Sequence, residues 1–93
     1  MKFCILLGTR PEIIKAGPII NCCESNNINY FVLHTGQHYA YEMDNIFFRD
    51  LKLPEPKYNL QIGSGSHGAQ TGLMLQKIED ILVKEKPDIV LVI

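Results

Sequence analysis

The chain has 93 residues, of which 46% are hydrophobic and 20% are charged, and its formal net charge is −1. This length suits one small domain or part of a larger one. The near-neutral charge argues against an electrostatic nucleic-acid binder, and no apolar run approaches the ~20 residues that a membrane span needs. Three cysteines, two of them adjacent, do not suggest a disulfide framework, and the N-terminus lacks a signal-peptide cleavage site. We therefore expect a cytoplasmic protein with reduced thiols, without nucleic-acid or membrane partners.

The first half of the chain predicts two strands around a helical segment. Residues 3–7 (FCILL) form a continuous apolar run, typical of a strand that is covered on both faces. Pro11 suits the first turn of a helix, whereas Pro18 removes an interior hydrogen bond. We therefore expect a short helical turn over residues 11–16 and a restart from Pro18 to about Glu24. Residues 30–34 (YFVLH) predict a second buried strand.

The second half predicts two more helices and a third buried strand. A helix is expected over residues 41–51, then an extended segment that includes a short strand around 58–62. The longest helix is expected over about 69–86, and residues 88–93 form the last apolar strand. The expected core-facing residues of the two helices are Met43, Ile46, Phe47 and Leu51, and then Met74, Leu75, Ile78, Ile81 and Leu82. The aromatic pair of Phe47 and Phe48 is also expected in the core. Buried strands that alternate with helices predict an α/β fold with a Rossmann-like parallel sheet and helical crossovers. The last strand is expected to be central, so residues 1–93 are interpreted as an incomplete domain.

The turn after the first strand, GTRP at 8–11, is the strongest candidate site. Gly8 permits a tight turn, and the helix start beyond it presents backbone N–H groups that favour an anion. Arg10 adds a fork of donors suited to phosphate, and Lys15 follows about one and a half helical turns later. The pattern favours anion binding; the alternative is an ordinary turn with a surface Arg and a solvated Lys.

Polar residues also follow the second predicted strand. Gln37 and His38 fall at its carboxyl end, on the edge where ligands of parallel sheets bind, so they are possible cleft residues. A helix cap with an exposed His explains them equally well. His34 and His38 do not share a helical face, because Gly36 lies between them, and we expect no metal site. The segment GSGSHG at 63–68 matches a dinucleotide-binding pattern but lies in the wrong βα unit. Two interpretations of the helix start stay open: residues 67–71 face the same edge of the sheet, or Ser64 or Ser66 simply caps the helix.

Four motifs together resemble the N-terminus of the non-hydrolysing UDP-N-acetylglucosamine 2-epimerases. They are GTRPE with a Lys at 8–15, TGQH at 35–38, SHGAQTG at 66–72 and KPDIVLV at 86–92. The resemblance covers all 93 residues in the family's order. It implies that residues 1–93 are an incomplete N-terminal Rossmann-like domain of a two-domain GT-B-type fold, whose remaining part and C-terminal domain are absent.

The resemblance also implies an activity and residue roles. Family members interconvert UDP-GlcNAc and UDP-ManNAc for polysaccharide biosynthesis, by eliminating UDP with loss of the C2 proton and adding it back, without metal or nicotinamide. A homodimer is implied. Arg10 and Lys15 would bind the UDP-sugar substrate, and Lys15 could assist the departure of UDP; Gly8, Gln37 and His38 would line the cleft. The main acid and base residues would lie beyond Ile93, so the fragment alone is predicted to be inactive.

Three alternatives remain open from the sequence. The hydrolysing UDP-GlcNAc 2-epimerases share this N-terminus, and other GT-B nucleotide-sugar enzymes, such as glycosyltransferases, are more distant possibilities. The third alternative is a truncated gene product without catalytic function.

Some bacterial relatives are activated by a second UDP-GlcNAc through a Gln-His-x-Gln stretch and an Arg. Here Gln37 and His38 match that stretch, but Ala40 replaces the second Gln and Ser66 stands where the Arg would be, so the sequence does not decide whether this activation occurs.

Overall fold

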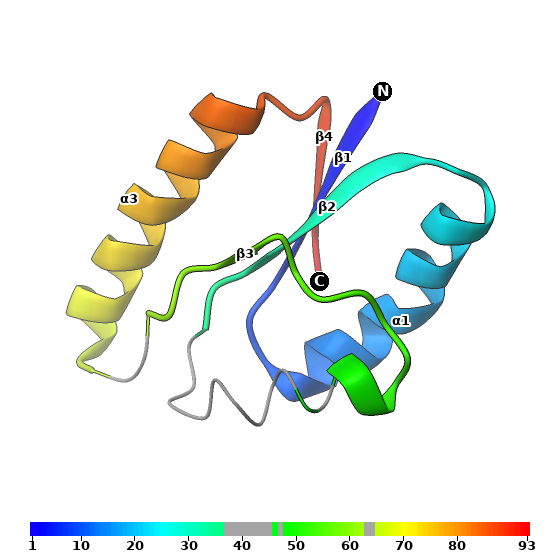
Figure 1. Ribbon diagram of the computed structural model, residues 1–93. Helices are drawn as coiled ribbons and strands as arrows, with labels where there is room; N and C mark the ends of the chain where they lie inside the picture. The colour runs from blue at the N-terminus through cyan, green and yellow to red at the C-terminus, as the bar shows by residue number, and fades with distance from the viewer. Residues whose placement is uncertain (37–45, 47, 63–64) are drawn as a thin grey trace.

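The protein folds as a parallel sheet with helices on both faces. The structure is a computed structural model that describes residues 1–36, 46, 48–62 and 65–93. The strands lie in the order β3-β2-β1-β4, and all neighbouring pairs are parallel. Helix α1 packs on one face of the sheet and helix α3 lies over the other (Figure 1). The elements are β1 (Lys2–Leu7), α1 (Arg10–Ser25), β2 (Asn29–His34), β3 (Tyr58–Asn59), α3 (His67–Glu85) and β4 (Ile89–Val92). The predicted α/β fold class, a Rossmann-like parallel sheet with helical crossovers, is confirmed.

The chain reverses its direction across the sheet at β1. From β1 it moves outward through α1 to β2 and then to β3, and it returns through α3 to β4 on the other side of β1. Cys4 of β1 is therefore paired with Phe31 of β2 on one side and with Val90 of β4 on the other. In open α/β sheets, ligands bind beyond the carboxyl ends of the strands at such a reversal point. The fold directs attention to the carboxyl ends of β1 and β4.

Helix α1 is continuous, so the predicted interruption at Pro18 is wrong. The helix runs from Arg10 to Ser25 with Pro18 inside it. Two local features make this possible. Gly17 precedes the proline and has no Cβ to clash with its ring. The helix also buries a stripe of Ile13, Ala16, Ile20 and Cys23 against the sheet, and this burial outweighs one lost hydrogen bond.

The two faces of the sheet are covered unequally. The core on the α1 face includes Ile5, Ile13 and Phe48, which are at most 1% exposed. On the other face Cys4, Phe31 and Leu33 are buried beneath α3, which itself has no fully buried residue. Within the predicted stripe of α3, Ile78, Ile81 and Leu82 pack against this core, whereas Leu75 is 68% exposed and was wrongly placed in it. Leu75 points away because its position on the helix lies about 100° from that of Met74.

Part of the expected core of the helix over residues 41–51 also needs correction. Ile46 and Leu51 were expected in the core but are 49% and 40% exposed, whereas the expected burial of Phe48 is confirmed. The remaining expected core residues of this helix, Met43 and Phe47, lie outside the described residues. Within residues 1–93, β4 pairs with β1 and Val92 is 68% exposed. A central position of this strand in the complete domain stays a prediction. Within the described part of the chain, no helix combines the length and apolar character that crossing a membrane requires.

Candidate functional site

The turn between β1 and α1 is closed by a carboxylate. Glu12 Oε1 accepts hydrogen bonds from the backbone N–H of Gly8, at 2.7 Å, and of Thr9, at 3.0 Å. Thr9 is the N-cap of α1 and has an extended backbone. A negative charge in the first turn also interacts favourably with the helix dipole. Sequence reasoning did not single out Glu12, although the Thr-x-x-Glu spacing of a capping box was there to find it.

This carboxylate changes how the turn could bind an anion. Two backbone N–H groups beside the helix start are engaged by Glu12, so they do not face a ligand in this conformation. The positive charges of the region belong to Arg10, which is half-buried at the start of α1, and Lys15, which is exposed one and a half turns further along. An anion bound here would therefore be held chiefly by these side chains.

The end of β2 lies directly beside the β1–α1 turn. The Thr35 N–H donates to the Leu7 carbonyl oxygen at 2.9 Å, and the Thr35 carbonyl oxygen accepts from the Ile62 N–H at 3.0 Å. Gly36 follows with a φ of 69°, and its N–H donates to His34 Nδ1 at 2.8 Å. The structure thus brings Thr35 close to Leu7 and Gly8. The two predicted cleft residues that follow, Gln37 and His38, lie outside the described residues.

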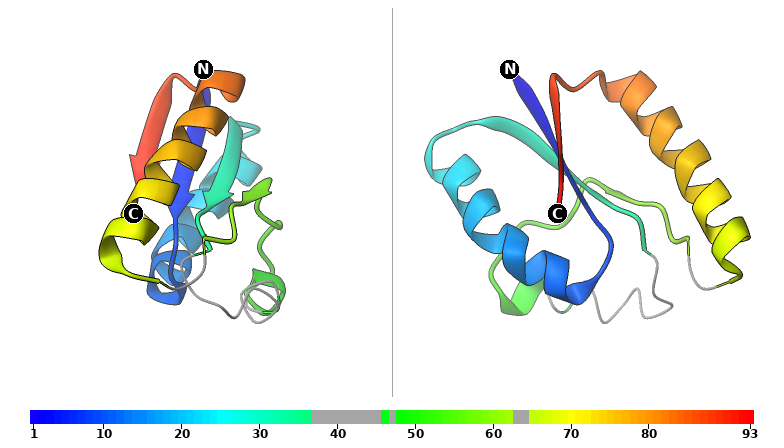
Figure 2. Two further views of the ribbon diagram at one scale, coloured as in Figure 1. Left: turned by 90° about the vertical axis from the view of Figure 1, so that its left-hand side faces the viewer. Right: turned by 180° about the vertical axis from the view of Figure 1, so that it is seen from behind.

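A cavity of about 140 Å³ opens between the carboxyl ends of β1 and β4. Gly8, Glu12 and Thr35 are among its lining residues, and β1, β4 and the middle of α3 provide apolar side chains. Both helices begin at the edge of the sheet where β1 and β2 end, so their positive dipole ends lie on the same side of the molecule (Figure 2). Of the residues predicted from sequence, Gly8 lines this cavity. Arg10 and Lys15 lie on the adjoining helix α1 and do not line it.

The histidine and cysteine of the central strands, His34 and Cys4, are buried in the core. His34 is fully buried, and its ring lies 6.0 Å from that of Phe48. Burial raises the pKa of the Cys4 thiol to about 11, so this thiol is neutral and packs as a small apolar group. Among the described residues, no group of three or more His, Cys, Asp or Glu side chains could hold a metal ion.

The start of α3 shows which serine caps it. The Ser66 hydroxyl oxygen accepts from the Ala69 N–H at 3.3 Å, and the helix begins at His67. A Cβ added at Gly65 or Gly68 would meet nothing within 4 Å, so these glycines do not mark a close backbone approach. The capping interpretation of this segment is confirmed for Ser66, whereas Ser64 lies outside the described residues.

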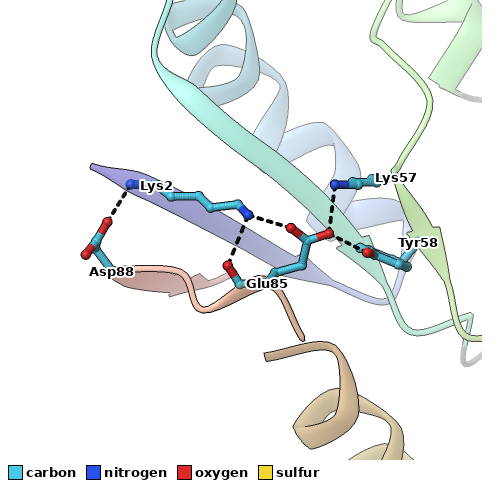
Figure 3. Close-up of polar contacts among 5 residues, drawn as sticks. All are labelled: Lys2, Lys57, Tyr58, Glu85 and Asp88. Atoms are coloured by element: carbon cyan, nitrogen blue, oxygen red, sulfur yellow. Dashed lines mark hydrogen bonds and ion pairs between the residues drawn. The ribbon is translucent and has the colours of Figure 1, made fainter. Parts of the chain in front are cut away.

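A cluster of charged groups lies at the opposite, amino-terminal edge of the sheet (Figure 3). The Glu85 carboxylate, 8% exposed, pairs with Lys2 Nζ at 2.5 Å and Lys57 Nζ at 2.7 Å, and it accepts a hydrogen bond from the Tyr58 hydroxyl. These donors, Lys2 first, lower the pKa of Glu85 to about 2. The cluster joins the end of α3 to β1 and β3, far from the cavity, and we interpret it as structural.

Comparison with known proteins identifies the family of this chain and several relatives. A family model described as UDP-N-acetylglucosamine 2-epimerase matches residues 2–93. The UDP-N-acetylglucosamine 2-epimerase of Methanocaldococcus jannaschii is 62% identical over 92 residues, which are 99% of this chain and 25% of that protein. The UDP-2,3-diacetamido-2,3-dideoxy-D-glucuronate 2-epimerase of Pseudomonas aeruginosa is 44% identical, over 99% of this chain and 26% of its own length.

A solved structure has the same fold. The crystal structure of the M. jannaschii UDP-GlcNAc 2-epimerase in complex with UDP-GlcNAc and UDP superposes with a TM-score of 0.92, at 62% identity, over 99% of this chain and 25% of that one. The chain spans about a quarter of the length of the relatives that it matches. Because the family model matches nearly every residue, the chain belongs to the UDP-N-acetylglucosamine 2-epimerase family.

Proposed function

We propose that the complete protein carrying this region interconverts UDP-N-acetylglucosamine and UDP-N-acetylmannosamine. The observation that supports this most strongly is the 62% identity, over 99% of the chain, with a relative named as such an epimerase. The reaction removes the C2 proton and UDP from the sugar, and UDP then adds back while a proton arrives on the other face of C2. The described residues supply one wall of the site, and the acid and base groups belong to the rest of the protein.

The positive side chains of α1 bind the diphosphate in this proposal. Arg10 offers paired donors and Lys15 a point charge, on a helix whose dipole is positive at the same end. Negative charge grows on UDP as the bond to the sugar breaks, so fixed cations favour the transition state over the bound substrate. The Gly8 and Thr9 N–H groups are already hydrogen-bonded to Glu12, so the Arg10 and Lys15 side chains bind the diphosphate in this proposal. Gln37 and His38, which follow β2 in the sequence, are proposed to line the same cleft.

The substrate class follows from what the two named relatives share. One relative is named for UDP-N-acetylglucosamine and the other for a UDP-2,3-diacetamido sugar acid. Both names describe a UDP-sugar with an acetamido group at C2, the carbon that a 2-epimerase inverts. We therefore assign this chain to an enzyme for 2-acetamido nucleotide sugars. A homodimeric, cytoplasmic enzyme in polysaccharide biosynthesis, with a second domain closing the cleft, is also part of the proposal, and the three free cysteines support a reducing compartment.

The decisive experiment is exchange of the C2 hydrogen in heavy water. The complete protein is incubated with UDP-GlcNAc in D₂O, and the products are followed by proton NMR and mass spectrometry. We expect deuterium at C2 of both UDP-GlcNAc and UDP-ManNAc. Release of UDP with free ManNAc would identify a hydrolysing enzyme instead, and release of UDP without any C2 exchange would contradict the proposed chemistry.

Two variants test the diphosphate site. Lys15→Gln should lower kcat/KM for UDP-GlcNAc by about tenfold or more, because a charged hydrogen bond contributes about 1.5–3 kcal/mol. The matched control is Lys84→Gln, which removes a lysine from the last turn of α3, far from the cavity. Equal activity of the two variants would remove Lys15 from the site. The 93-residue chain alone is expected to show no turnover.

A further inference from the structure

A residue with a left-handed backbone follows β3, at the edge of the sheet where the parallel strands end. Gln61 has a φ of 52°. Glycine adopts such a value readily, and Asn and Asp do so occasionally, whereas a glutamine is strained there. Residues held in strained conformations concentrate at functional sites, where the surrounding structure keeps them in place. Local sequence preference therefore does not explain why a glutamine occupies this position.

Hydrogen bonds on both sides of Gln61 impose its conformation. The Leu60 N–H donates to the His34 carbonyl oxygen at 2.9 Å. The Ile62 N–H donates to the carbonyl oxygen of the next residue along, Thr35, at 3.0 Å. The chain after β3 thus advances by two residues where the chain at the end of β2 advances by one, so Gln61 is an extra residue, as in a β-bulge. Bulges are common beside active sites, where they redirect a side chain.

The side chain of Gln61 has no structural role within the described part of the chain. It is exposed, and the hydrogen bond that this residue makes there comes from its backbone N–H, which donates to Asn59 Oδ1 at 3.0 Å. The carboxamide therefore keeps its two N–H donors and its carbonyl acceptor for another molecule or segment. An exposed side chain on a strained backbone is better explained by binding than by stability.

The place of Gln61 relative to the β1–α1 turn suits an elongated ligand. A Cβ placed on Gly36 would lie 2.8 Å from the Gln61 Cα, so Gln61 adjoins the chain that leaves β2. The end of β2 is joined to β1 in turn, because the Thr35 N–H donates to the Leu7 carbonyl oxygen. Two spacings between neighbouring strands amount to ~10 Å. A ligand whose diphosphate is held by Arg10 therefore reaches Gln61 if it extends across the ends of the strands, as a UDP-sugar can.

We propose that the Gln61 carboxamide hydrogen-bonds the UDP-sugar in the cleft at the carboxyl ends of the strands. The inference rests on the proposed function, which supplies the UDP-sugar. A carboxamide suits this ligand, because it can both donate to and accept from the hydroxyl and amide groups of a nucleotide sugar. The bonds on either side of Gln61 fix its backbone, so little further order is lost when the ligand binds. Gln61 is thus a substrate-binding residue that follows β3, in addition to the cations of α1.

The test separates binding from stability in the complete protein. Gln61→Gly removes the carboxamide and relieves the backbone, whereas Gln61→Met keeps the length of the side chain and removes its hydrogen-bonding groups. Both variants should weaken UDP-GlcNAc binding, measured by calorimetry, by about three- to tenfold, because a hydrogen bond to the ligand is lost. The unliganded Gln61→Gly protein should melt at or above the wild-type temperature, since glycine adopts this φ without strain.

Lys86→Gly is the matched control. Lys86 is also exposed and has a φ of 50°, but it follows α3 at the opposite, amino-terminal edge of the sheet. This variant relieves the same kind of strain and should keep UDP-GlcNAc affinity within about twofold of the wild type.

Two results would overturn the role of Gln61 and leave the epimerase proposal standing. One is wild-type affinity in both Gln61 variants. The other is a lower melting temperature of unliganded Gln61→Gly, which would assign the side chain to the fold. A wild-type protein that neither binds UDP-GlcNAc nor exchanges its C2 hydrogen would overturn the epimerase proposal and this inference together.

Discussion

Gly36 is a residue whose replacement the structure does not allow without strain. Its φ is 69°, and a Cβ at this position would lie 2.5 Å from Asn59 Oδ1 and 2.8 Å from the backbone of Gln61. Gly36→Ala should therefore destabilise the chain by about 1–3 kcal/mol, through both the left-handed backbone and the clash. The measurement is urea unfolding of the 93-residue chain. Gly72→Ala is the control, because a Cβ there meets nothing within 4 Å inside α3 and should be neutral or stabilising by up to ~1 kcal/mol. Equal effects at the two sites would show that the contact with Asn59 is not restrictive.

Glu12 stabilises the β1–α1 turn through two backbone bonds. Glu12→Ala leaves the Gly8 and Thr9 N–H groups without their acceptor and should cost about 1–2 kcal/mol of stability. Glu12→Gln retains an oxygen acceptor and should cost less. Thermal unfolding measures both, and Glu79→Ala, on an exposed position of α3, serves as the control. A loss for Glu12→Ala no larger than the control's would mean that the turn holds its shape unaided.

The residue scale also shows what a sequence can and cannot predict. Gly8 was expected at the edge of the site and lines the cavity, because a turn residue after a buried strand is placed by local chemistry. Glu12 was equally local and was missed. Thr35 could not have been found, because its position beside the cavity depends on how β1, α3 and β4 pack together. Arg10 and Lys15 remain predictions, since their roles concern a ligand.

Pro18 provides a prediction at the scale of the element. The helix α1 passes through this proline, which cannot donate to the carbonyl of Ile14. Pro18→Ala restores that donor. A proline inside a helix destabilises the folded state by about 3 kcal/mol relative to Ala. Replacing it also makes the unfolded chain more flexible, which lowers stability by up to ~1 kcal/mol, so a net gain of about 2 kcal/mol in the free energy of unfolding is expected. Urea unfolding measures the gain, and a destabilised variant would show that the proline ring contributes packing that outweighs the missing bond.

Helices and strands with a clear local pattern were predicted well from the sequence. Which side of each helix faces the core was predicted less well. Apolar runs identified β1 and β2, and helical spacing identified α3 to within two residues at its start. The break at Pro18 was wrong because burial of the α1 stripe is a tertiary effect that local propensity does not include. Leu75 was misplaced because a shift of one residue turns a side chain by about 100° around a helix. The pairing of β4 with β1 joins strands far apart in sequence, and no local pattern predicts such a pairing.

At the scale of the whole molecule, the Glu85 cluster joins segments that are distant in sequence. Lys2 is 83 residues from Glu85, and Tyr58 is 27 residues from it. These contacts connect β1, β3 and the end of α3 at the amino-terminal edge of the sheet, as Figure 3 shows. Since α3 has no fully buried residue, the cluster is a main attachment of this helix to the sheet. Loss of the Glu85 cluster should therefore lower the free energy at which α3 opens more than that at which α1 opens. Amide hydrogen exchange measured in the two helices would detect this difference.

The charge of Glu85 makes the stability of the molecule depend on pH. Its pKa is lowered from 4.5 to about 2 in the folded chain, chiefly by the bonds from Lys2 and Lys57, so folding favours the ionised form. The stabilisation is complete above about pH 4.5 and should be lost as the pH falls toward 2. The free energy of unfolding, measured with urea between pH 7 and pH 2, should therefore fall as the pH is lowered, and it should fall less in Glu85→Gln than in the wild type. The two curves should converge near pH 2. Glu79→Gln, which removes an exposed carboxylate of the same helix, should follow the wild-type curve. Parallel curves for wild type and Glu85→Gln would mean that the cluster does not hold α3 through its charge.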